Sequence, residues 1–283
     1  MRHNPRQLSL LLLILLFSAA VIIPNGAFAQ SADASAADSQ TPANAAPLPS
    51  TTSQTAAEQR QVSWKSLPKD FLHDQKDIWL FPLQLGKGHH WLPVLSVSGV
   101  TAGLIEADPH VMPYFQTHAR NLDKLNDAFD APITTGEVVL LPVSLLLAGY
   151  ARHDSYQVQT ALLAGEAYAD SAVVDLAIKA ITHRKRPSDV PQGAAFNDTF
   201  FSGSTSPFKG SSFPSGHSAG AFSVATVVAT RYKRHRWVPW AVYGFATAVS
   251  LSRISDSAHF PSDVFLGAAL GYATTRYEVL RPR

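Results

Sequence analysis

The sequence predicts an all-α protein. Apolar segments of helical length recur from residue 91 almost to the C-terminal end. No stretch of useful length alternates apolar and polar residues as a half-buried strand does. No internal repeat is visible, so a solenoid or propeller is not indicated. The composition becomes globular at Trp64, and we expect one helical domain over residues 64–283.

The N-terminal segment predicts export. Arg2 and Arg6 precede an apolar run from Leu8 to Ile23, and a small-x-small cleavage site, 27–29, follows it. We therefore expect residues 1–29 to be a signal peptide and the protein to be periplasmic. An uncleaved anchor is the alternative, although the run of 16 residues is a little short of a full membrane span.

Charge and cysteine content narrow the possible partners. Cleavage would lower Lys+Arg from 23 to 21 against 21 Asp+Glu, and this neutral balance argues against a nucleic-acid partner. The chain has no cysteine, which excludes thiol chemistry and cysteine-based metal sites. The histidines show no ligand-like grouping with acids, so no metal or other cofactor is expected.

Residues 30–63 are rich in Ala, Ser, Thr and Pro and predict a disordered linker. Residues 71–81 predict an amphipathic helix that packs on the domain, with a helix at a membrane surface as the alternative. About six core helices follow, at 91–105, 136–151, 156–182, 214–232, 237–251 and 261–277.

The core helices are apolar without being clear membrane spans. The apolar helical segment 237–251 has 15 residues without a charge, below the usual threshold of about 18. Glu166, Asp170 and Asp175 lie on one helix, where lipid would not tolerate them on an exposed face. We expect a periplasmic, membrane-associated domain, with an integral membrane protein as the alternative.

Three basic and histidine-containing clusters carry the chemistry. Lys179 and Arg186 lie seven residues apart, two turns along one helix, and Arg253 follows in the third cluster. Several cations that converge on one point suit the oxygens of a phosphate. Ser215 and Gly216 precede a helical segment whose free N–H groups would bind the same anion.

Two histidines and an aspartate complete a phosphoryl-transfer site. Asp263 lies four residues beyond His259 and can orient one imidazole nitrogen, which leaves the other free to attack phosphorus. His217 directly follows the anion-binding turn and suits the general acid.

Together the clusters read K-x6-R-P, P-S-G-H and S-R-x5-H-x3-D over residues 179–263. This pattern resembles the type 2 phosphatidic acid phosphatase superfamily, which includes non-specific acid phosphatases and vanadium haloperoxidases. The resemblance implies a helical bundle with the site at one end and a phosphohistidine intermediate on His259. Asp263 and His217 would be the other catalytic residues, and the phosphate ligands would be Lys179, Arg186, Ser215, Gly216 and Arg253.

The expected function is metal-independent hydrolysis of a terminal phosphate from a lipid, of the phosphatidic acid or polyprenyl pyrophosphate type. A non-specific acid phosphatase, a vanadium haloperoxidase and a non-catalytic binder of lipids or anions remain as alternatives. Two further expectations concern neighbouring residues. The residues from His183 to Lys185, including Arg184, are expected to form a solvated basic edge. The aromatic loop 188–212 is expected to anchor itself to the domain, with a lid or acyl-chain slot as the alternative.

Overall fold

A computed structural model describes residues 60–88, 90–118, 126, 129, 131–191, 193–203 and 211–282. In this part of the chain the regular structure is helical, and no strand occurs, which confirms the predicted fold class. The α-helices are α3 (Leu67–Gly86), α4 (Trp91–His118), α6 (Ala131–Ala151), α7 (Ser155–Thr182), α8 (Gly216–Arg231), α9 (Trp237–Ser255) and α10 (Pro261–Thr274). A 3-10 turn (Pro187–Asp189) and a π-helix (Thr275–Val279) complete the set.

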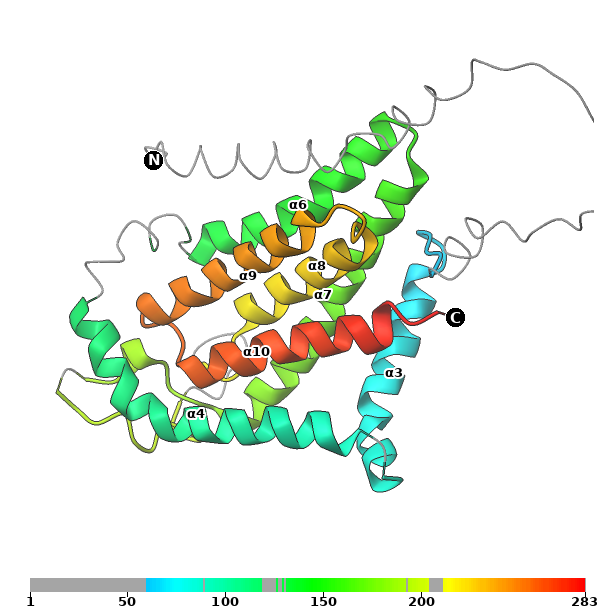
Figure 1. The fold of residues 1–283 in the computed structure, drawn as a ribbon. Coiled ribbons are helices and arrows are strands. Elements are labelled where there is room, and N and C mark those ends of the chain that lie inside the picture. Colours follow the sequence, from blue (N-terminus) through cyan, green and yellow to red (C-terminus); the bar gives the residue numbers. More distant parts are fainter. Residues whose placement is uncertain are drawn as a thin grey trace, which may run out of the picture.

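The bundle is built around α8, which packs against α7, α9 and α10 (Figure 1). Small side chains make this possible, because α8 buries alanine, serine and valine on most of its surface. At the crossing with α10, a Cβ on Gly271 would lie 2.1 Å from the carbonyl oxygen of Ala219. A Cβ on Gly267 would lie 2.4 Å from the Ser215 carbonyl oxygen, so the two helices approach this closely only through glycine.

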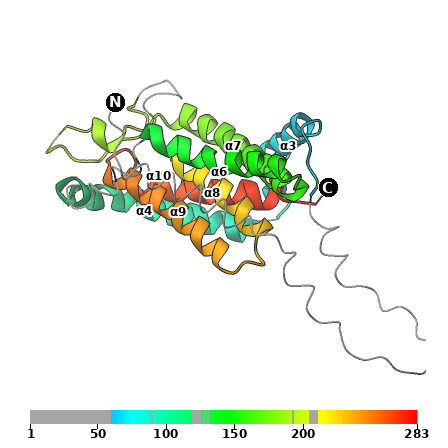
Figure 2. The ribbon, with the colours of Figure 1, turned by 90° about the horizontal axis from the view of Figure 1, so that it is seen from above.

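The outer helices cover the bundle from three sides. α6 lies along α7, α4 crosses beside α10, and α3 stands against α7 and the π-helix near the C-terminal end (Figures 1 and 2). None of the described helices combines the length and the apolar character required to span a bilayer.

Local sequence explains where the helices that carry the clusters begin. The Asp154 carboxylate accepts hydrogen bonds from the N–H groups of Tyr156 and Gln157 and caps α7. The Ser215 hydroxyl caps α8 in the same way. The Asp263 carboxylate accepts from the N–H of Phe260 at 2.8 Å and so caps α10, which begins with a proline.

Most predicted helices match the observed ones to within a few residues. The exception is α4, which continues 13 residues beyond the expected end at Ile105, through Pro109 and Pro113. The predicted linker also ends earlier, because Arg60 and Val62 are already buried in the domain. The predicted signal peptide, 1–29, and linker residues 30–59 lie outside the described residues.

Candidate active site

The first two clusters meet where α7 ends and α8 begins. Lys179 lies in the last turn of α7, and its Nζ contacts the Asp175 carboxylate at 2.7 Å. A Cβ placed on Gly216, the first residue of α8, would lie 3.2 Å from that Nζ and 2.9 Å from Asp175 Oδ2. The free N–H groups at the start of α8 therefore lie beside the Lys179 ammonium group, and together they can bind an anion.

His259 in the third cluster is buried, with 2% of its surface exposed. Its Nδ1 lies 2.7 Å from the carbonyl oxygen of Ser212 and 3.6 Å from Asp263 Oδ2. Because a carbonyl oxygen only accepts hydrogen bonds, Nδ1 carries the proton and Nε2 has the free lone pair. The expected orienting role of Asp263 is thus shared with a backbone carbonyl group.

The surroundings shift the pKa values of both residues. Burial lowers the pKa of His259 below its usual 6.5; Asp263 opposes this change, and the cations of Lys179 and Arg186 add to it. Burial alone would raise the pKa of Asp263, but its contacts with His259, Arg184 and the Phe260 N–H outweigh burial and lower it. The neutral imidazole therefore lies beside an ionised carboxylate.

The remaining predicted residues lie around this pair. The His217 and His259 ring centroids are 6.4 Å apart, and both Lys179 and Arg186 are close enough to influence the imidazole of His259. Arg253 is fully buried, and its carbonyl oxygen accepts the backbone N–H of His259 at 3.1 Å. The structure thus gathers the three clusters, separated by up to 84 positions, at one end of the bundle.

Ser215 has a more structural position than expected. It is fully buried, and its hydroxyl oxygen accepts from the N–H of Ser218 at 3.4 Å and from the Ser218 hydroxyl at 3.2 Å. Its backbone N–H donates to the Asp263 carbonyl oxygen, which joins the α8 start to α10. Phosphate contacts at this turn would therefore come from the backbone of Gly216 and His217.

The prediction of a solvated basic edge was wrong for Arg184, which is only 1% exposed. Its guanidinium group contacts Asp263 and also Asp108 of α4, a buried carboxylate that sequence reasoning missed. A carboxylate before a proline, more than 70 residues from the first cluster, gives no local signal of this contact. Ser212 was missed as well, because its contribution is a backbone carbonyl group.

The aromatic loop divides into buried and exposed parts. Phe196 is buried and meets Phe260 edge to face, and Phe200 packs on Phe213. Phe201, by contrast, is 76% exposed. The predicted anchoring therefore describes Phe196 and Phe200, while Phe208 lies outside the described residues.

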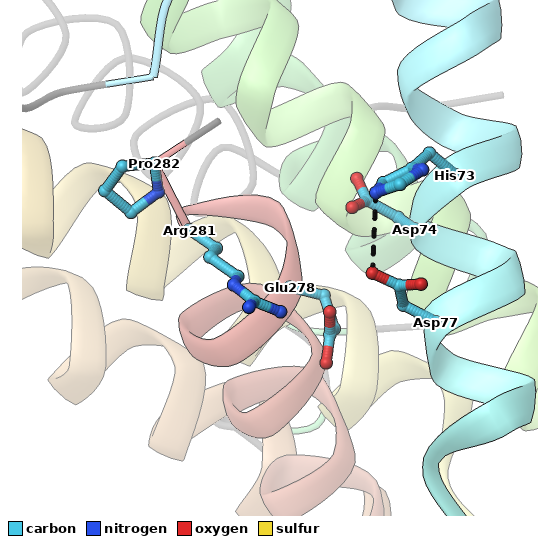
Figure 3. A pocket seen from close by; sticks show the side chains of 6 residues that line it. All are labelled: His73, Asp74, Asp77, Glu278, Arg281 and Pro282. Carbon is cyan, nitrogen blue, oxygen red and sulfur yellow. Dashed lines mark ion pairs between the residues drawn. The ribbon is translucent and has the colours of Figure 1, made fainter.

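A polar cavity of about 220 Å³ lies elsewhere, between α3 and the C-terminal segment. Figure 3 shows side chains of α3 on one side of it and those of the C-terminal segment on the other. Its lining residues are His73, Asp74, Asp77, Glu278, Arg281 and Pro282. Asp74 also meets Glu166 and Asp170 in a buried acidic group, but the guanidinium of Arg60 contacts both Asp74 and Glu166 and already supplies a cation there.

Comparisons with known proteins agree with the motifs. Residues 160–281 match the family model of the PAP2 superfamily. Lipid A 1-phosphatase of Porphyromonas gingivalis is 44% identical over 61 residues, which are 21% of this chain and 14% of that protein. Bacitracin transport permease protein BcrC of Bacillus licheniformis is 42% identical over 60 residues, 21% of this chain and 28% of that protein. The chain thus spans less than a third of either relative.

A solved structure is also similar. The transmembrane PAP2 type phosphatidylglycerolphosphate phosphatase from Bacillus subtilis has 20% identity and a TM-score of 0.37. The match covers 72% of this chain and 93% of that one.

Proposed function

We propose that this chain belongs to the PAP2 superfamily, whose family model matches residues 160–281, and that it is a phosphatase that removes a terminal phosphate from a lipid. The observation that carries the proposal is the state of His259, whose protonated Nδ1 is held by a carbonyl group beside Asp263. Nε2 is then the nucleophile, and the cations of Lys179 and Arg186 lie near enough to neutralise the phosphate it attacks.

The reaction would proceed in two steps. Nε2 of His259 forms a bond to phosphorus while the bond from phosphorus to the ester oxygen breaks, and His217 protonates the departing oxygen. Asp263 stabilises the positive charge that the phosphorylated imidazole acquires. Water, deprotonated by His217, then attacks phosphorus and releases inorganic phosphate, which restores His259.

A lipid substrate is supported by the relatives and by the surface of the molecule. One relative is named as a lipid A 1-phosphatase, and the chain itself exposes large apolar side chains. We test the proposal by measuring phosphate release from detergent-dispersed phosphatidic acid and from a small aryl phosphate, with a chelator present. Release from the lipid that disappears in His259→Ala is the expected result, and acid quenching should trap a phosphorylated histidine.

Other outcomes would argue against the proposal. Faster release from the aryl phosphate would favour a non-specific acid phosphatase. If a folded protein released no phosphate from either compound, the phosphatase proposal would be wrong.

We further propose that α3 holds the protein on a membrane surface. This helix turns Asp74 and Gln75 inward, whereas Leu72, Trp79 and Leu83 are each more than half exposed. A helix whose polar side chains face the domain and whose apolar side chains face outward can place those apolar side chains in the surface of a lipid bilayer. Trp79→Ala with Leu83→Asn should weaken co-sedimentation with lipid vesicles, while Trp240→Ala, an exposed residue on α9, should not. Equal binding by all these variants would contradict the assignment.

A further inference from the structure

Arg184 occupies the centre of a buried polar network at the start of α10. The hydrogen bonds of its guanidinium group go to side chains of residues that are themselves at least nine-tenths buried. Nε donates to Thr199 Oγ1 at 3.1 Å, one terminal nitrogen donates to Ser262 Oγ at 2.7 Å and Asp263 Oδ1 at 2.6 Å, and the other donates to Asp108 Oδ2 at 2.7 Å. The faces of the guanidinium group are covered as well, by Phe260 with its centroid at 4.0 Å and Phe200 at 4.4 Å. The side chain therefore has little freedom to move.

Asp108 links this arginine to α4. Its Oδ2 accepts from Arg184 and from the Ser262 hydroxyl group at 2.5 Å, and its Oδ1 accepts from the Ser262 N–H at 3.2 Å. Ser262 is the second residue of α10, so a carboxylate from α4 lies at the N-terminal end of that helix, where negative charge is favourable. Asp108 thus fixes both the arginine and the helix that carries Asp263.

The two carboxylate oxygens of Asp263 have different partners. Oδ1 contacts Arg184, whereas Oδ2 accepts from the Phe260 N–H and faces His259. These contacts on both sides determine the orientation of the carboxylate plane. Without the arginine, Asp108 and Asp263 would be two buried carboxylates close together, and one of them would take up a proton.

We propose that Arg184 and Asp108 are positioning residues, which hold the Asp263 carboxylate ionised and directed at the imidazole of His259. The inference rests on the proposed function, because its consequence is that the phosphorylated imidazole keeps a correctly placed negative charge. Because the guanidinium nitrogens of Arg184 donate to Thr199, Ser262, Asp263 and Asp108, we expect neither Arg184 nor Asp108 to contact the phosphate. Their removal should therefore lower kcat and leave KM nearly unchanged.

The experiment compares the full-length wild type with Arg184→Met, Arg184→Lys and Asp108→Asn. Supporting residues of this kind typically contribute about 10- to 100-fold to activity, and we expect such a fall in kcat with KM within about twofold. Arg184→Met should raise the pKa of Asp263, and a protonated Asp263 no longer stabilises the imidazolium form of His259. The acid limb of the kcat/KM profile, which reports protonation of His259, should therefore move to lower pH while kcat falls. Asp108→Asn removes a competing carboxylate and should not move that limb to lower pH. Arg184→Lys should restore part of the activity.

Arg231 supplies the matched control. It is also a buried arginine stacked on an aromatic ring, with its guanidinium 4.0 Å from the Tyr156 centroid and its Nε bonded to Thr160, but it lies at the opposite end of α8. Arg231→Met should lower thermal stability and leave kcat and the pH profile of the folded enzyme unchanged. An equal loss of kcat in Arg231→Met would mean that Arg184 contributes only to the stability of the fold.

A second measurement does not depend on turnover. Nitrogen NMR of labelled histidine follows the titration of His259, and the pKa of this imidazole should fall in Arg184→Met because a protonated Asp263 no longer supports the imidazolium form. Unchanged titration and unchanged kcat in folded Arg184→Met and Asp108→Asn would overturn the inference. If the wild type releases no phosphate but the pKa of His259 still falls in Arg184→Met, the proposed function would be wrong. The positioning role of Arg184 would then still stand. If Arg184→Met does not fold, the kcat and KM of Asp108→Asn test the inference instead.

Discussion

At the scale of single residues, Asp175 is the group whose chemistry most directly opposes phosphate binding. Its Oδ2 contacts Lys179 Nζ at 2.7 Å, and the side chain is buried beside the start of α8. Burial raises the pKa of Asp175, although Lys179 counteracts this effect. The carboxylate is a counter-ion for the ammonium group, and a bound phosphate has to compete with it.

Asp175→Asn should therefore tighten inhibition by inorganic phosphate about fivefold, corresponding to about 1 kcal/mol for the competing ion pair. Lys179→Met serves as the comparison and should weaken the same inhibition. Inhibition constants from initial rates test both. Weaker inhibition in Asp175→Asn would mean that the carboxylate supports Lys179 rather than competing for it.

The buried state of His259 predicts the pH dependence. In the proposed mechanism His259 has to be neutral to attack phosphorus, and burial lowers its pKa below 6.5, so activity should persist on the acid side of that value. As the pH falls further, His259 gains a proton and kcat/KM falls; as the pH rises, His217 loses the proton that it must donate. A bell-shaped kcat/KM profile with its acid limb below pH 6.5 is expected. A flat profile between pH 4 and 8 would contradict the assignment of the two histidines.

At the scale of elements, the loop between the first two clusters contacts both the end of α7 and the side chain of Arg184. Phe201 has a positive φ of 56°, which is uncommon for an aromatic residue, and its N–H donates to the Thr182 carbonyl oxygen at 2.9 Å. The backbone is thus held to the end of α7 while the ring remains exposed. Phe200, its neighbour, covers the guanidinium of Arg184.

These positions predict different effects for two adjacent alanine substitutions. Phe201→Ala should raise KM for a lipid phosphate severalfold and leave KM for an aryl phosphate unchanged, because an exposed ring can contact an acyl chain. Phe200→Ala should lower stability by about 1 to 2 kcal/mol, because its half-buried ring packs on Phe213 and on the guanidinium of Arg184. Steady-state kinetics on both substrates and thermal melting separate them. Equal KM changes on both substrates in Phe201→Ala would exclude a selective contact with lipid.

Helical periodicity was sufficient to predict most elements, and motif spacing identified site residues that the fold brings to one end of the bundle. His259, Asp263 and Lys179 could be proposed from the sequence because they stand at the spacings of the motifs K-x6-R-P and S-R-x5-H-x3-D. Asp108 and Arg184 could not, because their burial depends on how α4 crosses α10. The expected helix ended at Ile105, whereas α4 continues through Pro109 and Pro113, each of which removes a backbone hydrogen bond, and this part of the helix packs beside α10.

At the scale of the whole molecule, Arg60 joins the beginning and the end of the described chain. Its guanidinium contacts Asp74 of α3 at 3.1 Å, Glu166 of α7 at 2.7 Å and the carbonyl oxygen of Val279 at 2.6 Å. Removing one partner of a buried ion pair leaves a charge uncompensated. Arg60→Met should therefore lower the free energy of unfolding by about 3 kcal/mol, as measured by denaturant titration. A change below about 1 kcal/mol would show that solvent reaches the carboxylates.

Glu166 gives the same network a pH dependence. Burial raises its pKa to about 8 in spite of Arg60, so the folded protein holds this proton more tightly than the unfolded chain does. Its contribution to stability is complete below pH 4.5 and is lost as the pH rises through about 8. Glu166→Gln should flatten the fall in unfolding free energy over that interval. An unchanged slope would assign the pH dependence to other groups.

The contact between Asp108 and Arg184 extends the smallest fragment that we expect to be active, because that fragment has to include α4. The region that matches the PAP2 family model begins at residue 160, yet a side chain from α4, some fifty residues earlier, completes the network around the proposed catalytic residue Asp263. A fragment cut to the recognisable boundaries would carry all three motifs and still leave Arg184 with one carboxylate instead of two. Fragments for expression, and grafts onto other helical bundles, should therefore include α4. The boundaries of the motifs show where the sequences of relatives are similar, but the residues that contact Asp263 and Arg184 extend beyond them.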